Sequence, residues 1–108
     1  ISGKVQDALR LYQRAHAIFR AAGERRSQAI VLQDIGQIYW DAADYPRTLE
    51  YFRQSEETFA DDPTLLLTMR NNRGEVLRTM GRFDEAARAY QAALRDARAL
   101  NSAVLEVR

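Results

Sequence analysis

The chain has 108 residues, of which 46% are hydrophobic and 29% are charged, with only five glycines and two prolines. This composition is too apolar for a disordered linker and too poor in glycine and proline for a turn-rich β-sandwich, so we expect a single, mostly helical domain. Sixteen Lys and Arg residues against fifteen Asp and Glu residues give a net charge of +1, without the basic excess typical of proteins that bind nucleic acids or anionic membranes. With no cysteine and one histidine, the sequence excludes disulfides, thiolate zinc sites and His-rich metal centres, and we predict no metal and no cofactor.

The ends and the apolar runs of the chain give two further expectations. The longest apolar runs are far shorter than the 18 or more residues that a membrane span needs, so no membrane association is expected. The chain begins at Ile1, without an initiator Met or a signal-peptide pattern, and we expect it to be a piece of a longer protein.

The sequence predicts five helices, at residues 4–22, 25–42, 45–60, 63–80 and 83–99, followed by the start of a sixth at 102–108. Apolar residues recur at helical spacing within each range, for example Leu32, Ile35 and Tyr39 in the second. The predicted breaks coincide with residues that cap or end helices. These are Gly23, Asp44 with Pro46, Asp61-Asp62-Pro63, Gly81 and Asn101.

A pattern of small and aromatic residues recurs three times along the chain. A small residue is followed by an aromatic residue four positions later and by another small residue after three more. The three copies are Ala8-Tyr12-Ala15, Thr48-Phe52-Ser55 and Ala86-Tyr90-Ala93. A glycine also lies twelve residues before the second and third copies, as Gly36 and Gly74. We expect these glycines to let paired helices approach closely and the aromatic side chains to fill the gap between successive pairs.

Because of this recurring pattern, the sequence resembles the tetratricopeptide repeat family, in a variant with longer helices. The resemblance covers all 108 residues and implies an all-α superhelix of antiparallel helix pairs. The corresponding division is 1–23 for the second helix of one repeat, 24–62 and 63–100 for two whole repeats, and 101–108 for the start of the next helix. Arg70 and Arg73 depart from the pattern, because the family usually has apolar residues there.

The resemblance also implies a binding surface, since the first helix of each pair lines the concave face in this family. The positions implied to face inward are Ile30, Gln33, Asp34, Gln37, Trp40 and Asp41 in one repeat, and Thr68, Asn71, Asn72, Glu75, Arg78 and Thr79 in the next. Of these, the residues we predict to contact a ligand are Gln33, Gln37, Trp40, Asn71, Asn72, Glu75 and Arg78. Asn72 matches an asparagine that holds the peptide backbone in long-repeat relatives, because an amide both donates and accepts hydrogen bonds. Packing alone is the alternative for Trp40, and surface ion pairing for Arg78.

Catalytic and metal-binding interpretations are weaker than structural ones for the remaining candidates. His16 has no neighbouring nucleophile pattern, and a position on the surface or in a helix seam explains it. The acid pairs Asp61-Asp62 and Asp84-Glu85 sit at predicted helix starts, where carboxylates complement the helix dipole. Glu56 and Glu57 are adjacent on one helix and point about 100° apart.

We therefore predict a non-enzymatic module that binds a protein or peptide segment on its concave face. The alternative is a ligand- or peptide-sensing regulatory domain of a bacterial transcription regulator or signalling protein. The use of arginine over lysine favours a cytoplasmic protein from a high-GC bacterium. Self-association through uncapped terminal helices is a further prediction, in which Val104, Leu105 and Val107 pack on the last helix or on another copy.

Overall fold

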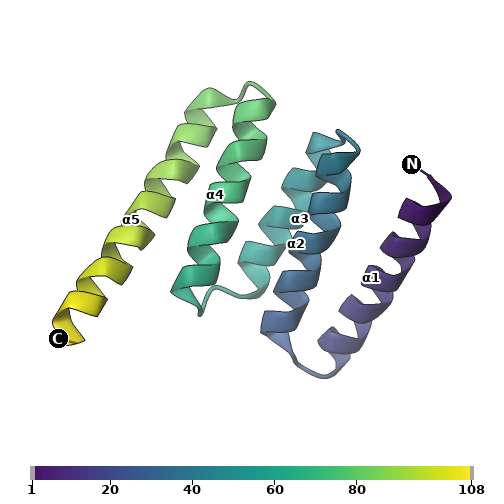
Figure 1. Ribbon diagram of the computed structural model, residues 1–108, viewed down its shortest axis with the longest axis horizontal. Coiled ribbons are helices and arrows are strands. Elements are labelled where there is room, and N and C mark those ends of the chain that lie inside the picture. The colour runs from purple at the N-terminus through teal and green to yellow at the C-terminus, as the bar shows by residue number, and fades with distance from the viewer. Residues whose placement is uncertain (1, 108) are drawn as a thin grey trace. The chain divides into compact units, whose positions relative to one another are not determined.

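The described residues form five helices, and consecutive helices run in opposite directions within residues 3–58 and within residues 63–107 (Figure 1). The structure is a computed structural model that describes residues 2–107, with side chains for residues 2–101. The helices are α1 (Gly3–Ala21), α2 (Arg25–Asp41), α3 (Tyr45–Thr58), α4 (Pro63–Thr79) and α5 (Phe83–Val107). No strand occurs within these described residues. The predicted all-α repeat fold is confirmed.

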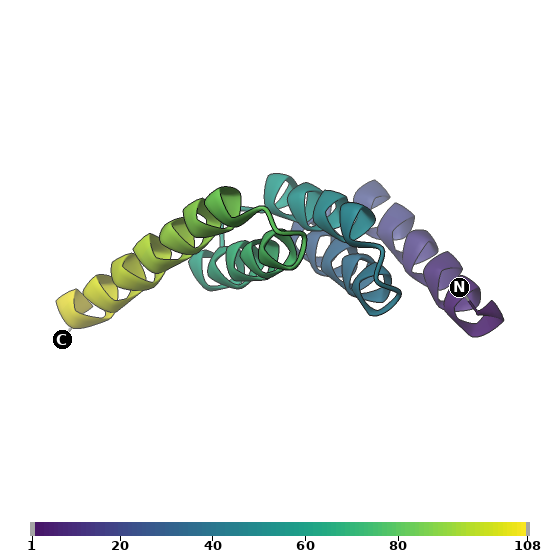
Figure 2. The ribbon, with the colours of Figure 1, turned by 90° about the horizontal axis from the view of Figure 1, so that it is seen from above.

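The chain divides into two compact units, one of residues Ile1–Phe59 and one of residues Ala60–Arg108. The first unit holds α1, α2 and α3, and the second holds the antiparallel pair of α4 and α5. Figure 2 shows the same helices from above. None of the described helices combines the length and apolar character that crossing a membrane requires.

The predicted helix starts are explained by side chains that accept hydrogen bonds from the first free backbone amides. The Ser2 hydroxyl accepts from the amide of Val5, and the Asp44 carboxylate accepts from the amide of Arg47. The Asp62 carboxylate accepts from both Thr64 and Leu65, at 3.0 and 3.2 Å. Pro46 and Pro63 each lie in the first turn after these aspartates, where the missing amide hydrogen is not needed.

Three helices end in the same left-handed turn, at Gly23, Ala43 and Gly81. The φ angles of these residues are +71°, +59° and +78°. Each turn has the paired backbone hydrogen bonds of a Schellman motif, such as Ala43 to the Trp40 carbonyl and Asp44 to the Tyr39 carbonyl, both at 2.9 Å. The predicted helix ends at Gly23 and Gly81 are confirmed. Ala43 adopts the same left-handed backbone conformation, which is usually found at glycine.

The predicted break at Asn101 is wrong, because α5 continues without interruption to Val107. Asn tolerates the left-handed turn but does not require it, and the residues around Asn101 favour helix. There is therefore no separate sixth helix within the described backbone. The predicted packing of Val104, Leu105 and Val107 lies outside the residues whose side chains the structure describes.

The core of the first unit lies between α1 and α2. Its buried centre is formed by Leu9 of α1 with Val31, Ile35 and Tyr39 of α2. Half-buried apolar side chains pack around this centre: Val5, Tyr12, Ala15, Phe19, Ile38 and Tyr51. Tyr12 therefore lies between its own helix and the following pair, as predicted.

The contact between paired helices is built on the two repeat glycines. A Cβ atom added to Gly36 would lie 2.6 Å from the ring of Phe52, and one added to Gly74 would lie 2.8 Å from the ring of Tyr90. Close approach at the glycines is confirmed. The predicted place of these two rings needs correction, because each lies over the glycine of the helix before it, within a pair. Thr48 and Ala86 are buried, as the small-residue positions require.

Four large apolar side chains, two at helical spacing on α1 and two on α5, are exposed. Leu11 and Ile18 on α1 are 64% and 60% exposed, and Phe83 and Leu94 on α5 are 66% and 50% exposed. Each helix has a second apolar side that no described helix covers.

Arg70, which departs from the family pattern, has a specific partner in the second unit. Its guanidinium donates to the carboxylate of Asp96 on α5 at 2.6 Å. Both side chains are largely shielded, with 29% and 20% of their surface exposed. The ion pair joins α4 to α5 within the second unit.

Candidate binding surface

An exposed polar strip runs along α2 on the side away from the core. We call Asp34, Gln37 and Asp41 the α2 strip; all three are exposed and fall at helical spacing. They lie about 140–200° around the helix from buried Leu32. The side-chain amide of Gln37 donates to the Asp41 carboxylate at 3.2 Å, which aligns the two groups along the strip.

Local burial makes one end of the α2 strip chemically distinct. Desolvation raises the pKa of the Asp34 carboxyl above its ordinary value. A carboxylate that is partly desolvated gains more from a cationic partner than a fully hydrated one does. No ion pair in the described part of the chain involves Asp34 or Asp41. The α2 strip thus presents two carboxylates to the solvent.

Gln33 and Trp40 flank the α2 strip and are half-buried. The Trp40 ring meets the Tyr45 ring edge to face, with 5.3 Å between centroids. Trp40 therefore contributes to the packing of α2 on α3, and only part of its ring is available to a ligand.

A corresponding strip runs along α4 in the second unit. We call Thr68, Asn71, Glu75 and Arg78 the α4 strip; all four are exposed and lie on the side of α4 turned away from buried Met69. The strip offers hydroxyl, amide, carboxylate and guanidinium groups in succession. Asn72, next to Asn71, is half-buried.

The seven predicted ligand-contact residues therefore form two sets. Gln33, Gln37 and Trp40 share one face of α2 in the first unit. Asn71, Asn72, Glu75 and Arg78 lie on or beside the α4 strip in the second unit. Of the seven, Gln37, Asn71, Glu75 and Arg78 are exposed and the others are half-buried. Asp34 and Asp41 were not among the residues predicted to contact a ligand.

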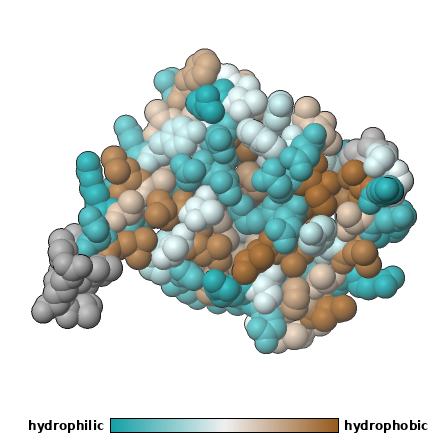
Figure 3. Space-filling view, in the orientation of Figure 1, coloured by the Kyte–Doolittle hydropathy of each residue, from teal (hydrophilic) through white to brown (hydrophobic). Residues whose placement is uncertain are grey.

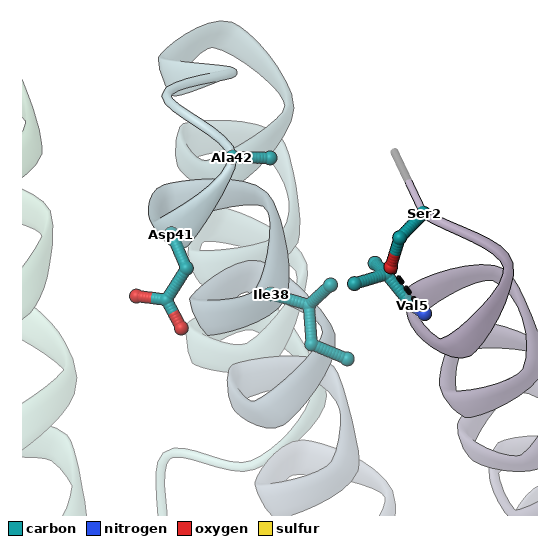
Figure 4. A pocket seen from close by; sticks show the side chains of 5 residues that line it. All are labelled: Ser2, Val5, Ile38, Asp41 and Ala42. Atoms are coloured by element: carbon teal, nitrogen blue, oxygen red, sulfur yellow. Dashed lines mark hydrogen bonds between the residues drawn. The ribbon is translucent and has the colours of Figure 1, made fainter.

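A pocket of about 430 Å³ opens between the start of α1 and the end of α2 (Figure 4). Val5 and Ile38 face each other across it, whereas the Asp41 carboxylate points away from α1. The Ser2 hydroxyl at its rim is already used to cap α1. This pocket is mainly an apolar gap between two helix ends.

A second pocket, of about 260 Å³, lies between α1 and α3 and is lined mostly by polar side chains. We call it the α1–α3 slot, and its lining residues are His16, Arg20, Gln28, Leu32, Gln54, Glu57 and Thr58. This site could not be predicted from the sequence, because its residues come from three helices with no common spacing.

Metal-ligating side chains do not cluster in the part of the chain that the structure describes. The described residues contain no group of three His, Asp or Glu side chains placed to hold a metal ion. The predicted capping role of Asp62 is confirmed by its hydrogen bonds. Asp84 and Glu85 lie in the first turn of α5, and the hydrogen bond from Arg82 lowers the pKa of Glu85.

Comparison with known families agrees with this architecture. Two family models, both described as tetratricopeptide repeat, match residues 1–61 and 66–103. The chain belongs to the tetratricopeptide repeat family, whose repeats generally mediate protein–protein interactions and are typically not catalytic. A comparison with curated proteins finds no match.

Proposed function

We propose that the chain is a non-enzymatic module that binds an extended segment of a partner protein along the α2 strip. The α4 strip of the second unit is a separate candidate surface of the same kind. The observation that carries this proposal is that both helices use one side for the core and leave a continuous polar strip on the other. Amide side chains such as Gln37 and Asn71 suit a peptide backbone, because each offers a donor and an acceptor.

The charge of the α2 strip defines the chemistry of the segment it would bind. Asp34 and Asp41 flank Gln37, and no basic residue belongs to this strip. A Lys or Arg side chain of the partner would form charge-assisted hydrogen bonds with either carboxylate. The α4 strip carries one acid and one base, so it favours a polar segment without a strong net charge.

The test is selection of peptides from a random display library on the purified chain. We expect the selected peptides to carry a basic residue and to lose about tenfold in affinity for the Asp34→Asn, Asp41→Asn double variant. Asp7→Asn is the matched control, because Asp7 is an exposed acid on α1, outside the strip. Peptides that bind the double variant as well as the original chain would refute the proposal.

We also propose that the exposed apolar sides of α1 and α5 support self-association. On α1, Leu11 and Ile18 lie beside Ala8 and Ala15, which are only half-buried. The matching small residues of the other two repeat copies are buried: Thr48, Ser55, Ala86 and Ala93. An uncovered α1 face of this kind favours association with another helix.

Sedimentation over a range of protein concentrations tests this association. The original chain is expected to gain mass with concentration, and the Leu11→Glu, Ile18→Glu double variant to stay monomeric. Arg14→Glu is the control on the same helix, because Arg14 is exposed and polar already. A constant monomer mass for the original chain would exclude self-association.

A further inference from the structure

The α1–α3 slot has two chemically different walls above an apolar floor. His16 and Arg20 of α1, with Gln28 of α2, form one wall, and Gln54, Glu57 and Thr58 of α3 form the other. Leu32, which is only 3% exposed, lies at the base.

The wall made by α1 and α2 holds unused hydrogen-bond donors. No hydrogen bond or ion pair within the described residues engages the side chains of His16, Arg20 or Gln28. The guanidinium of Arg20 is a permanent cation with five N–H donors, and the Gln28 amide adds two more. This wall therefore suits an anionic group that accepts several hydrogen bonds.

The α3 wall is held in place by bonds within α3 and presents acceptors. The Gln54 amide donates to Glu50 at 3.2 Å, and the Thr58 hydroxyl donates to the Gln54 carbonyl at 2.7 Å. Arg53 donates to Glu57 at 3.2 Å and so partly neutralises that carboxylate. The oxygen atoms that remain on Gln54 and Thr58 can accept hydrogen bonds from a ligand.

We propose that the α1–α3 slot binds an acidic side chain, most simply a glutamate, from a partner protein. The carboxylate would accept hydrogen bonds from Arg20, His16 and Gln28. The methylene groups of the side chain would pack on Leu32, and a backbone N–H of the partner would donate to the α3 wall. A carboxylate fits better than a phosphate, because the second negative charge of phosphate would be repelled by Glu57.

This site is independent of the proposed function. Leu32 and Gln28 face the slot, whereas the α2 strip lies on the opposite side of the same helix. The slot also prefers an acidic group, whereas the α2 strip prefers a basic one. The binding proposals for the two surfaces can therefore be tested independently, and one can be refuted while the other holds.

The test is a titration of the chain with capped glutamate, N-acetyl-glutamate N-methylamide, followed by NMR. His16 is the only histidine, so its ring protons are an unambiguous reporter, and the Gln28 side-chain amide is a second one. We expect saturable shifts of both signals at millimolar concentrations, as for a single charged group in a small pocket. Capped glutamine, which has nearly the same shape without the charge, is expected to produce no saturable shift.

Three variants make the test specific. Arg20→Gln is expected to weaken binding about tenfold, and Arg14→Gln, on the same helix but outside the slot, to leave it unchanged. Glu57→Gln is expected to strengthen binding about threefold, because it removes a repelling carboxylate. Circular dichroism of each variant checks that the fold is retained.

The alternative outcomes each overturn the assignment. Absence of a saturable shift up to about 50 mM capped glutamate would exclude a carboxylate site. Tighter binding of inorganic phosphate would make the slot a phosphate site, and tighter binding of free glutamate would make it a site for the zwitterionic amino acid. Weaker binding by Glu57→Gln would show that Glu57 accepts a hydrogen bond from the ligand and does not repel it, which contradicts the proposed arrangement of the carboxylate.

Discussion

Phe52 packs directly on the backbone of Gly36, so closely that a Cβ atom on Gly36 would lie 2.6 Å from Cε1 of the ring. The same relationship recurs 38 residues later, where the ring of Tyr90 covers Gly74. In both pairs the glycine and the ring come from consecutive helices, which the absent side chain allows to approach. In each repeat, the aromatic ring thus occupies the space that a side chain at the glycine position would fill.

Substitution of Gly36 by alanine is therefore expected to destabilise the first unit by about 1–3 kcal/mol, because the ring of Phe52 must move out of a well-packed site. Gly36→Leu is expected to cost more. Urea denaturation measures the free energy of unfolding. Gly3→Ala is the control, since nothing lies within 4 Å of a Cβ atom at Gly3. Equal stability of Gly36→Ala and Gly3→Ala would show that the ring yields without cost.

At Ala43, the reverse substitution, alanine to glycine, is expected to raise the stability of the chain. It holds the left-handed conformation that Gly23 and Gly81 adopt in the equivalent turns, and a Cβ atom makes this conformation unfavourable. Ala43→Gly is expected to stabilise the chain by about 0.5–1 kcal/mol, and Gly81→Ala to destabilise it by a similar amount. Thermal unfolding measures both. A lower midpoint for Ala43→Gly would mean that unfolded-chain entropy outweighs the relief of strain.

Local signals explain why the first four helices were predicted to within about two residues. Asp44 and Asp62 cap helices through bonds to amides two or three residues away, and Gly23 and Gly81 end them through their own φ angles. Such effects depend only on neighbours in the sequence. The end of α5 was missed because Asn101 permits a turn without imposing one.

Features that depend on distant residues could not be predicted in this way. Leu11 and Ile18 fit a helical stripe, but the sequence does not say which side of α1 another helix covers. Arg70 forms an ion pair with Asp96, 26 residues later in the sequence. No local pattern around either residue predicts this pair. The strip residues were among the positions that the family resemblance implied to face inward, whereas the burial of Trp40 depends on the contact with Tyr45.

The Arg70–Asp96 ion pair is expected to contribute measurably to the stability of the second unit. Both side chains are shielded from water, so removing one partner leaves a charge with reduced solvation. Asp96→Asn is expected to cost about 1–2 kcal/mol, less than for a fully buried pair. A double-mutant cycle with Arg70→Met measures the coupling. The exposed pair of Arg82 and Glu85 is the control, and equal coupling in both pairs would contradict the role of burial.

Asp34 gives the chain a pH dependence that can be separated from its proposed role in binding. Burial raises the pKa of its carboxyl, so the folded state binds this proton more tightly than the unfolded state does. The stability that comes from the protonated form is present below the unfolded pKa and is lost as the pH rises through the raised pKa. Asp34→Asn is therefore expected to be slightly more stable than the original chain at pH 7 and no different in acid.

Glu50 is the matched control for this pH dependence. Hydrogen bonds from Arg53 and Gln54 lower the pKa of Glu50, so its contribution is present at neutral pH and is lost as the pH falls through the lowered pKa. Glu50→Gln is expected to reduce stability at pH 7, opposite to Asp34→Asn. Urea denaturation between pH 2 and 7 distinguishes the two, and a shift in the same direction for both would refute the assignment. Because Asp34→Asn is not expected to unfold the chain, any loss of peptide binding in that variant would report on the charge of the α2 strip.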